Sequence, residues 1–326
     1  MEKVLTLADT PIETYQGLSF TLSILLAHDY LKELYHDHYV NLQFIKNDDI
    51  EGIEHCRFQF HGVLYDHFRS EGVFEIHTFQ LDNLKPEKLR DFLRERINQY
   101  NYIIIFDVDE FYLGYSELYK KIHFAHDTYI YGYEDDTFLA MAYSEHKLQK
   151  VRIPIEELLQ GMQCYAAIDP DIYFGSLRVN SHYNAVFDKE RFQREVSDYL
   201  NGRASGETSA NQVFGINCYD ALKEYLDWVK IKNDNGRYHP DLRAFRMLWE
   251  HKKVMKDHLV FLKERYEVRD ELFIMVDALI EKSNLLFLYM MKYNARPHQE
   301  IIVEVKRQLD LMRVMDQRFM KCVQEI

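Results

Sequence analysis

Two segments decide how this sequence is interpreted: Tyr102-Ile-Ile-Ile-Phe-Asp-Val-Asp-Glu-Phe-Tyr-Leu113 and His123-Phe-Ala-His126-Asp-Thr-Tyr-Ile-Tyr-Gly-Tyr-Glu-Asp-Asp136. Each contains an apolar run of strand length that meets a cluster of acids. Two histidines open the second segment. Chemistry is expected where acids and imidazoles collect at strand ends, and two incompatible kinds of chemistry are consistent with this pattern.

The flanking sequence predicts alternating strands and helices in the first half. Apolar spacing predicts a helix from about Thr14 to Leu34, a second over Lys85–Tyr100, and a third that begins at Pro154, a residue favoured in a first helical turn. Strands are predicted at Tyr39–Ile45, Val73–Leu81, Tyr102–Val108, Thr128–Tyr133, Phe138–Tyr143 and Lys150–Ile153.

The second half has a different pattern, because it is almost entirely helical in its apolar spacing. Helices are predicted at Phe187–Leu200, Asn217–Ile231, Pro240–Tyr266, Asp270–Lys292 and His298–Glu325. We therefore expect an α+β domain with an antiparallel sheet over residues 1–167, followed by a helical domain over residues 168–326.

Composition excludes several classes of function. The 326 residues carry a formal net charge of −13, which argues against binding to nucleic-acid phosphates or to an anionic membrane. The four cysteines, Cys56, Cys164, Cys218 and Cys322, are widely spaced and indicate reduced thiols rather than disulfides or a zinc site. With no secretion signal and no apolar run of membrane-spanning length, we expect a cytoplasmic protein.

The acids that end the first segment allow a metal site. If side chains alternate, Asp107 and Asp109 lie on the same side of the strand end, where two carboxylates can hold Mg²⁺ or Mn²⁺. Nucleotide-sugar glycosyltransferases carry this kind of Asp-x-Asp-Glu-Phe sequence after a strand. Acid pairs at strand ends are more often solvated termini or caps, so this motif alone is weak evidence.

The histidines of the second segment suggest a different site. His126 opens a strand that continues to Gly132, and papain-like enzymes place their catalytic imidazole at such a sheet edge, opposite a nucleophile at a helix N-terminus. An isolated histidine more often only packs or caps a strand. His123 and His126 could also ligate a metal, but the sequence places no third ligand, so we expect neither a metal nor a cofactor.

The block from Asp109-Glu110-Phe through His123-Phe-x-His126 to Gly132-Tyr resembles the papain-like butirosin-H family, which is related to peptidase C39-like proteins. The segment Tyr15-Gln-Gly-Leu-Ser-Phe-Thr-Leu-Ser is similar to the helix start that precedes this block in that family. The resemblance extends over most of the chain, but its motifs are diffuse.

The resemblance implies transfer of an acyl group from a carrier-protein thioester to a small-molecule amine, in specialised peptide or amide biosynthesis. His126 would be the general base, Asp109 and Glu110 would shape the pocket entrance, and the acidic surface would face a cationic amine. The remaining expected pocket residues are Tyr15, Tyr112, His123 and Asp127.

The sequence departs from the family pattern at two positions. No cysteine lies at the first helix start, around Gly17 to Ser19, so Ser19 is the candidate nucleophile there. The position that would orient the imidazole holds Ala142 and Tyr143, which are neither acids nor amides. Either His126 acts directly on an amine that attacks an activated thioester, or the protein is a degenerate member that binds a carrier protein or synthetase.

The C-terminal segment is methionine-rich, with Met312, Met315 and Met320 close to Leu309 and Leu311. Its simplest interpretation is a packed amphipathic helix. The same face could instead form a homodimer contact.

Overall fold

The computed structural model describes residues 2–46, 56–80, 86–145, 147–166, 173–205, 208–233 and 239–326. The chain is a mixed α+β protein, with a mainly antiparallel sheet region and a series of C-terminal helices, so this part of the fold prediction is confirmed. No helix in the described ranges is both long enough and apolar enough to cross a membrane.

The chain divides into two compact units, and each is built from two separate stretches of sequence. The first unit comprises Met1–Leu31 and Leu64–Asn184, and the second comprises Lys32–Val63 and Ala185–Ile326. The boundary predicted between residues 167 and 168 lies outside the described residues.

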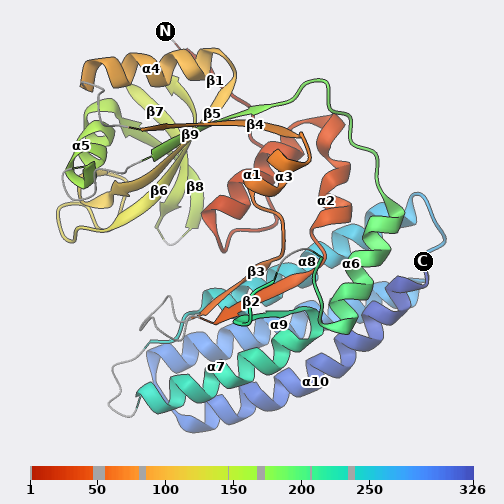
Figure 1. Ribbon diagram of the computed structural model, residues 1–326. Coiled ribbons are helices and arrows are strands. Elements are labelled where there is room, and N and C mark those ends of the chain that lie inside the picture. The colour runs from red at the N-terminus through yellow and green to blue at the C-terminus, as the bar shows by residue number, and fades with distance from the viewer. Residues whose placement is uncertain are drawn as a thin grey trace. The chain divides into compact units, whose positions relative to one another are not determined.

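A seven-stranded sheet forms the centre of the first unit (Figure 1). Its order is β4-β9-β5-β6-β7-β8, with β1 paired to β6, and every neighbouring pair is antiparallel. The strands are β1 (Glu2–Val4), β4 (Phe74–Gln80), β5 (Asn101–Asp109), β6 (Ala125–Glu134), β7 (Thr137–Ser144), β8 (Lys147–Pro154) and β9 (Tyr173–Val179).

Helices cover both faces of this sheet, which is why the central strand β5 is apolar on both sides. On one face, Phe20 of α1 (Gln16–Ala27) packs against Tyr102 and Tyr129 with ring centroids 5.9 and 5.0 Å apart. On the other face, Phe92 of α4 (Pro86–Asn98) packs against Phe174 of β9 at 5.5 Å. Helix α5 (Ile155–Ala166) covers the carboxyl end of β5 on the same side as α4.

A β-bulge interrupts β5 immediately before its last residues. Ile105 pairs with Thr128 but Val108 pairs with His126, so β5 contains one residue more than β6 between these two pairs. Asp107 accommodates the extra residue with a φ of 57°, a value that aspartate adopts more readily than most residues. The bulge brings Val108 back to the face that α5 covers.

Short helical segments complete the first unit: η1 (Asp29–Leu31) follows α1, α3 (Tyr65–Ser70) precedes β4, and η3 (Glu110–Tyr112) follows β5. Of the acids in the first quoted segment, Asp107 and Asp109 lie within β5, and Glu110 is the first residue of η3.

The second unit combines a small sheet with long helices. Its sheet has the order β10-β2-β3, with β2 at Leu42–Lys46, β3 at Cys56–Phe60 and β10 at Gln212–Phe214. The helical elements are α2 (Glu33–His38), α6 (Lys189–Asn201), η4 (Gly215–Asn217), α7 (Cys218–Lys232), α8 (Arg243–Lys263), α9 (Asp270–Ala295) and α10 (Gln299–Gln324).

Helix α9 packs against both α8 and α10, and its buried residues are spaced three or four apart, such as Leu272, Val276 and Leu279. Met312 and Met320 of α10 are buried, as expected of a packed amphipathic helix.

Candidate functional site

The candidate site begins where β5 ends and the chain turns into η3. Asp109 is the N-cap of η3, and its Oδ1 accepts hydrogen bonds from the backbone N–H groups of Phe111 and Phe124, at 3.1 and 3.2 Å. A capping aspartate satisfies donors that a helix start leaves unpaired. The cap therefore fixes the direction in which the next residue, Glu110, leaves the strand.

Glu110 and His126 form a hydrogen-bonded dyad. Oε1 of Glu110 lies 2.9 Å from Nδ1 of His126, and Ser116 donates its hydroxyl to the second carboxylate oxygen at 2.6 Å. The Glu110 side chain is 11% exposed and the His126 side chain 37% exposed. The carboxylate is thus held inside the protein while the imidazole reaches the surface.

This geometry determines the tautomer of a neutral His126. An ionised carboxylate can only accept hydrogen bonds, so Nδ1 carries the hydrogen and Nε2 carries the lone pair. Nε2 has no hydrogen-bond partner among the described residues. A carboxylate that orients an imidazole in this way is the arrangement used in general-base catalysis, where it also stabilises the imidazolium that forms.

A second dyad lies beside the first. Oδ2 of Asp109 is 2.7 Å from Nδ1 of His123, whose ring stacks on Phe111 with centroids 4.1 Å apart. The His123 side chain is 64% exposed. The imidazole of His123 is therefore less enclosed than that of His126. Because Asp109 also caps η3, we assign this second dyad a mainly structural role.

Residues of the 114–116 turn and of α5 hold the first dyad in place. Burial, followed by the negative charge of Glu110, raises the pKa of Tyr115, which hydrogen-bonds Thr128 on β6. Gly114 donates its N–H to Glu157 of α5 at 2.7 Å. A Cβ on Gly161 would lie 2.8 Å from Val108 Cγ1, so a glycine is needed for α5 to approach β5 closely.

Tyr112, predicted as a pocket residue, is the last residue of η3. Its hydroxyl is 3.0 Å from Sγ of Cys164 on α5. This hydrogen bond is the largest cause of the raised pKa of Tyr112. Cys164 therefore contacts the region around the dyads, although its spacing in the sequence gave no indication of a role.

Ser19, the predicted nucleophile, is not brought together with His126. Its side chain is fully buried in α1, where the hydroxyl donates to the carbonyl oxygens of Ile12 and Tyr15 at 2.7 and 3.0 Å. Such back-bonding is ordinary for a serine inside a helix. Tyr15, predicted as a pocket residue, is likewise buried at the N-cap of α1.

The two faces of β6 explain this separation. Side chains alternate along a strand, so His126 shares the α5 side of the sheet with Thr128, while Asp127 and Tyr129 lie on the α1 side. A Cβ on Gly17 would lie 2.8 Å from the Tyr129 hydroxyl oxygen, which in turn is 3.3 Å from Asp127 Oδ2. The start of α1 therefore faces Tyr129 and Asp127 rather than His126.

The two aspartates of the predicted metal pair, Asp107 and Asp109, differ in their surroundings. The bulge leaves Asp107 exposed, whereas Asp109 is buried and already bonded to two N–H groups and to His123. The strand is irregular here, because the register shifts between Ile105 and Val108. In the described residues, neither aspartate belongs to a cluster of three side-chain ligands close enough to share one ion.

The imidazole of His126 is oriented by Glu110, a residue to which sequence analysis assigned a different role. We expected an orienting group near Ala142 and Tyr143, but the Tyr143 hydroxyl donates to the carbonyl of Glu13. Glu110 orients the imidazole instead of shaping the pocket entrance. Ser116, which donates to Oε2 of Glu110, was missed by the sequence analysis.

A scan against models of protein families found no match to the chain, and a search of curated proteins found none either.

Proposed function

We propose that the protein transfers an acyl group from a thioester to an amine, with His126 as the general base and without a covalent acyl-enzyme. The observation that carries this proposal is the 2.9 Å bond between Glu110 and His126, which leaves Nε2 of a half-exposed imidazole available to accept a proton. The resemblance of the surrounding residues to butirosin-H-like proteins suggests a carrier-protein thioester as the acyl donor.

In the proposed reaction, the amine nitrogen attacks the thioester carbonyl carbon and Nε2 of His126 removes a proton from that nitrogen. Glu110 stabilises the resulting imidazolium through its bond to Nδ1–H. The tetrahedral intermediate then expels the thiolate, the C–S bond breaks, and the imidazolium returns the proton to sulfur. Because a thioester is already activated, positioning and one base suffice for this chemistry.

The proposal keeps only part of the papain-like arrangement. A helix near the N-terminus packed on an antiparallel sheet supports a papain-like description of the first unit. A nucleophile on that helix is left out, because Ser19 is buried and bonded to carbonyl groups. The net charge of −13 favours a cationic amine as the acceptor.

The test is acyl transfer from short acyl thioesters of a carrier protein to a panel of primary amines. We expect His126→Ala to lower kcat about 10²- to 10⁴-fold, the usual contribution of a general base. His123→Ala is the matched control, since it removes an imidazole from the neighbouring dyad, and it should retain most of the activity.

Two outcomes would count against the proposal. Equal turnover by His126→Ala and the wild type would remove His126 from the mechanism. If the wild type turns over none of the thioesters but binds the acylated carrier protein, the chain is a binding partner rather than a transferase.

A further inference from the structure

A cavity of about 650 Å³ lies at the opposite end of β5 from the Glu110–His126 dyad. It is bordered by Tyr102 at the start of that strand, whereas Asp109 ends it, so the two places are roughly 20 Å apart at about 3.3 Å per strand residue. Its volume is in the range of small-molecule sites. All residues that line it belong to the first unit.

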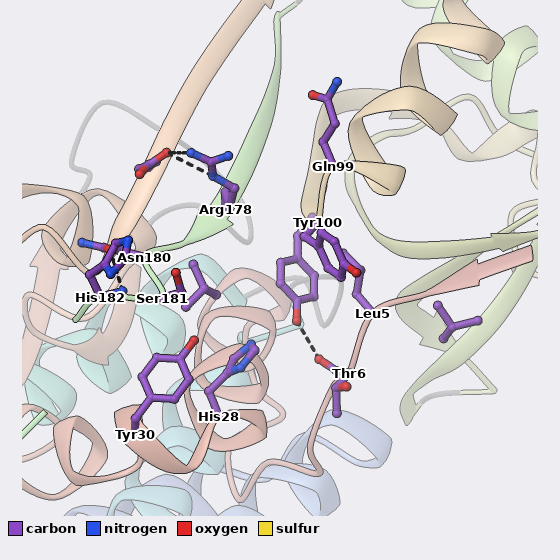
Figure 2. Close-up of a pocket in the computed structure, with 14 residues that line it drawn as sticks. Leu5, Thr6, His28, Tyr30, Gln99, Tyr100, Arg178, Asn180, Ser181 and His182 are labelled. Carbon is purple, nitrogen blue, oxygen red and sulfur yellow. Dashed lines mark hydrogen bonds and ion pairs between the residues drawn. The ribbon is translucent and has the colours of Figure 1, made fainter. Parts of the chain in front are cut away.

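Aromatic rings form much of the cavity wall (Figure 2). His28 and Tyr30 follow α1 with ring centroids 5.5 Å apart and planes tilted by 50°. The Tyr102 hydroxyl donates to the carbonyl of Thr6 at 2.7 Å, which fixes that ring. Tyr100 has a φ of 63°, an uncommon value for a tyrosine, and its ring is largely exposed. Backbone strain of this kind is concentrated at functional positions.

An ion pair provides the charged part of the lining. Glu75 and Arg178 are directly opposite each other on β4 and β9. Nε and Nη2 of Arg178 both bond to Oε2 of Glu75. Oε1 of Glu75 and Nη1 of Arg178 make no bond to any other described residue. The two charges balance, which disfavours a strongly charged ligand, while a carboxylate acceptor and a guanidinium donor remain side by side.

Neutral groups that can both donate and accept hydrogen bonds complete the lining. Burial lowers the pKa of His28 and raises the pKa of Tyr30, so both side chains are uncharged at neutral pH. Nε2 of His28 is buried and has no hydrogen-bond partner within the described part of the chain. Ligand hydroxyl groups also donate and accept at once, and are therefore matched to such side chains.

We propose that this cavity binds a neutral saccharide ring. The hydroxyl groups would bond to the open edges of Glu75 and Arg178 and to Tyr30, and the C–H face of the ring would lie against a tyrosine, whose π face is negative. A nucleobase is less well matched, because His28 and Tyr30 are tilted and do not form a parallel slot. This proposal does not depend on the acyl-transfer proposal.

The test uses the full chain and the methyl glycosides of glucose, galactose, mannose and N-acetylglucosamine as probes, followed by saturation-transfer-difference NMR titration. We expect saturable binding of at least one glycoside. Arg178→Gln and Tyr30→Phe should each weaken this binding at least tenfold. Arg152→Gln is the matched control, since Arg152 forms a comparable exposed ion pair with Glu134 elsewhere on the same sheet, and it should bind as the wild type does.

Three results would overturn the proposal. The first is the absence of saturable binding for all four glycosides. The second is equal binding by wild type, Arg178→Gln and Tyr30→Phe, with circular dichroism confirming that both variants are folded. The third is stronger binding of adenosine than of any glycoside, which would indicate a nucleoside site.

Discussion

Glu110 and His126 are sixteen residues apart in the sequence and meet through a 2.9 Å bond between Oε1 and Nδ1. The bond depends on three local features: the bulge at Asp107, the cap that Asp109 provides, and the pairing of Val108 with His126. Together they turn an acid at the end of one strand toward a histidine at the start of the next.

Replacing the orienting carboxylate should reduce acyl transfer without unfolding the protein. In Glu110→Gln the amide can present either its oxygen or its NH₂ group to Nδ1, and it no longer stabilises an imidazolium. We expect kcat to fall by roughly 10- to 100-fold, less than removal of the base itself. The exposed neighbour variant Glu117→Gln should behave as wild type, and a similar loss in both would point to a general charge effect.

Ser19→Ala separates direct transfer from a covalent mechanism. Our account predicts a kcat within about twofold of wild type, because the hydroxyl only donates to the Ile12 and Tyr15 carbonyls. Unfolding should cost about 1 kcal/mol less, the typical net contribution of such hydrogen bonds. Steady-state kinetics and thermal melts check both values, and a folded variant that has lost activity would restore Ser19 as nucleophile.

The second unit contains a fully buried ion pair whose role can be measured. Nζ of Lys252 lies 2.6 Å from Oδ2 of Asp316, with both side chains at 0% exposure, and Nδ1 of His251 is 2.9 Å from the same Nζ. Lys252→Met leaves a buried carboxylate without its cation and should destabilise the unit by about 3–5 kcal/mol.

The matched control for that pair is the exposed bridge between Lys306 and Asp227, where Lys306→Met should cost only about 0–1 kcal/mol. Urea unfolding followed by tryptophan fluorescence is selective for this unit, because both tryptophans of the chain, Trp228 and Trp249, belong to it. Equal costs for the two lysine variants would mean that burial of the first pair is not maintained in solution.

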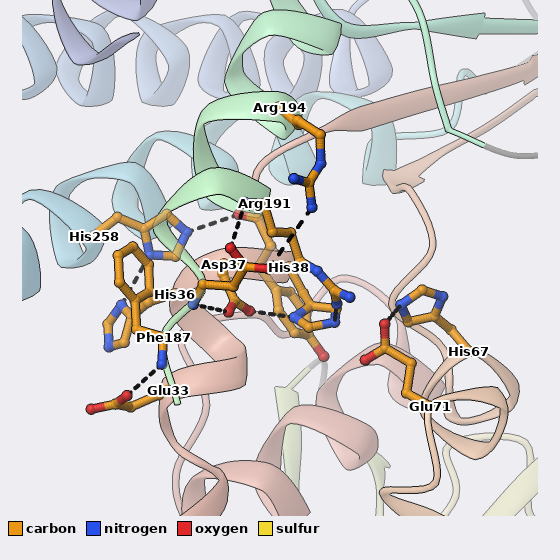
Figure 3. A network of polar contacts seen from close by, with 12 residues as sticks. Glu33, His36, Asp37, His38, His67, Glu71, Phe187, Arg191, Arg194 and His258 are labelled. Carbon is orange, nitrogen blue, oxygen red and sulfur yellow. Dashed lines mark hydrogen bonds and ion pairs between the residues drawn. The ribbon is translucent and has the colours of Figure 1, made fainter. Parts of the chain in front are cut away.

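The second unit should also lose stability in mild acid. Burial lowers the pKa of three histidines in this unit from the 6.5 of the unfolded chain. The pKa of His36 falls to about 2 and that of His258 to about 4 (Figure 3). The pKa of His251 is lowered as well. Below pH 6.5 the unfolded chain binds protons that the folded unit does not. The stabilisation is thus complete above pH 6.5 and is lost as the pH falls toward the folded values.

Glu195 opposes this trend, because burial raises its pKa to about 7 and its contribution is lost as the pH rises from 4.5 through 7. Burial also raises the pKa of Asp257, and three histidines outweigh these two carboxyl groups, so the free energy of unfolding should fall between pH 6.5 and 4. His36→Gln should reduce that slope by about 1.4 kcal/mol per pH unit between pH 6 and 4. The exposed variant His298→Gln is the control, and an unchanged slope in His36→Gln would contradict the assignment.

Sequence patterns predicted the long elements well, because apolar spacing reports directly on burial. The helix predicted at Asp270–Lys292 is observed as Asp270–Ala295, and the strand predicted at Tyr102–Val108 as Asn101–Asp109. Strand β9 (Tyr173–Val179) was missed, and it contains Gly175 near its centre, a residue type that is depleted in strands.

The candidate site was predictable in part. His126 was identified from its position at a strand start and Glu110 from the family resemblance, but their direct contact required the register of β5 on β6, which alternation alone does not give. Asp107 is exposed in the bulge, whereas Asp109 caps η3 and bonds His123, a difference that the sequence did not indicate. Ser19 was predicted as the nucleophile, but its hydroxyl donates to the carbonyl groups of Ile12 and Tyr15, contacts that the sequence does not reveal.

The most direct test of the central claim is chemical rescue of His126→Gly by free imidazole in the acyl-transfer assay. If the Nε2 atom of His126 is the base, the variant should lose about 10²- to 10⁴-fold in kcat, and added imidazole should restore a saturable part of it. Rescue should be absent in the wild type and in His123→Gly. A variant that retains full turnover, or one whose loss imidazole does not relieve at any concentration, would contradict the account.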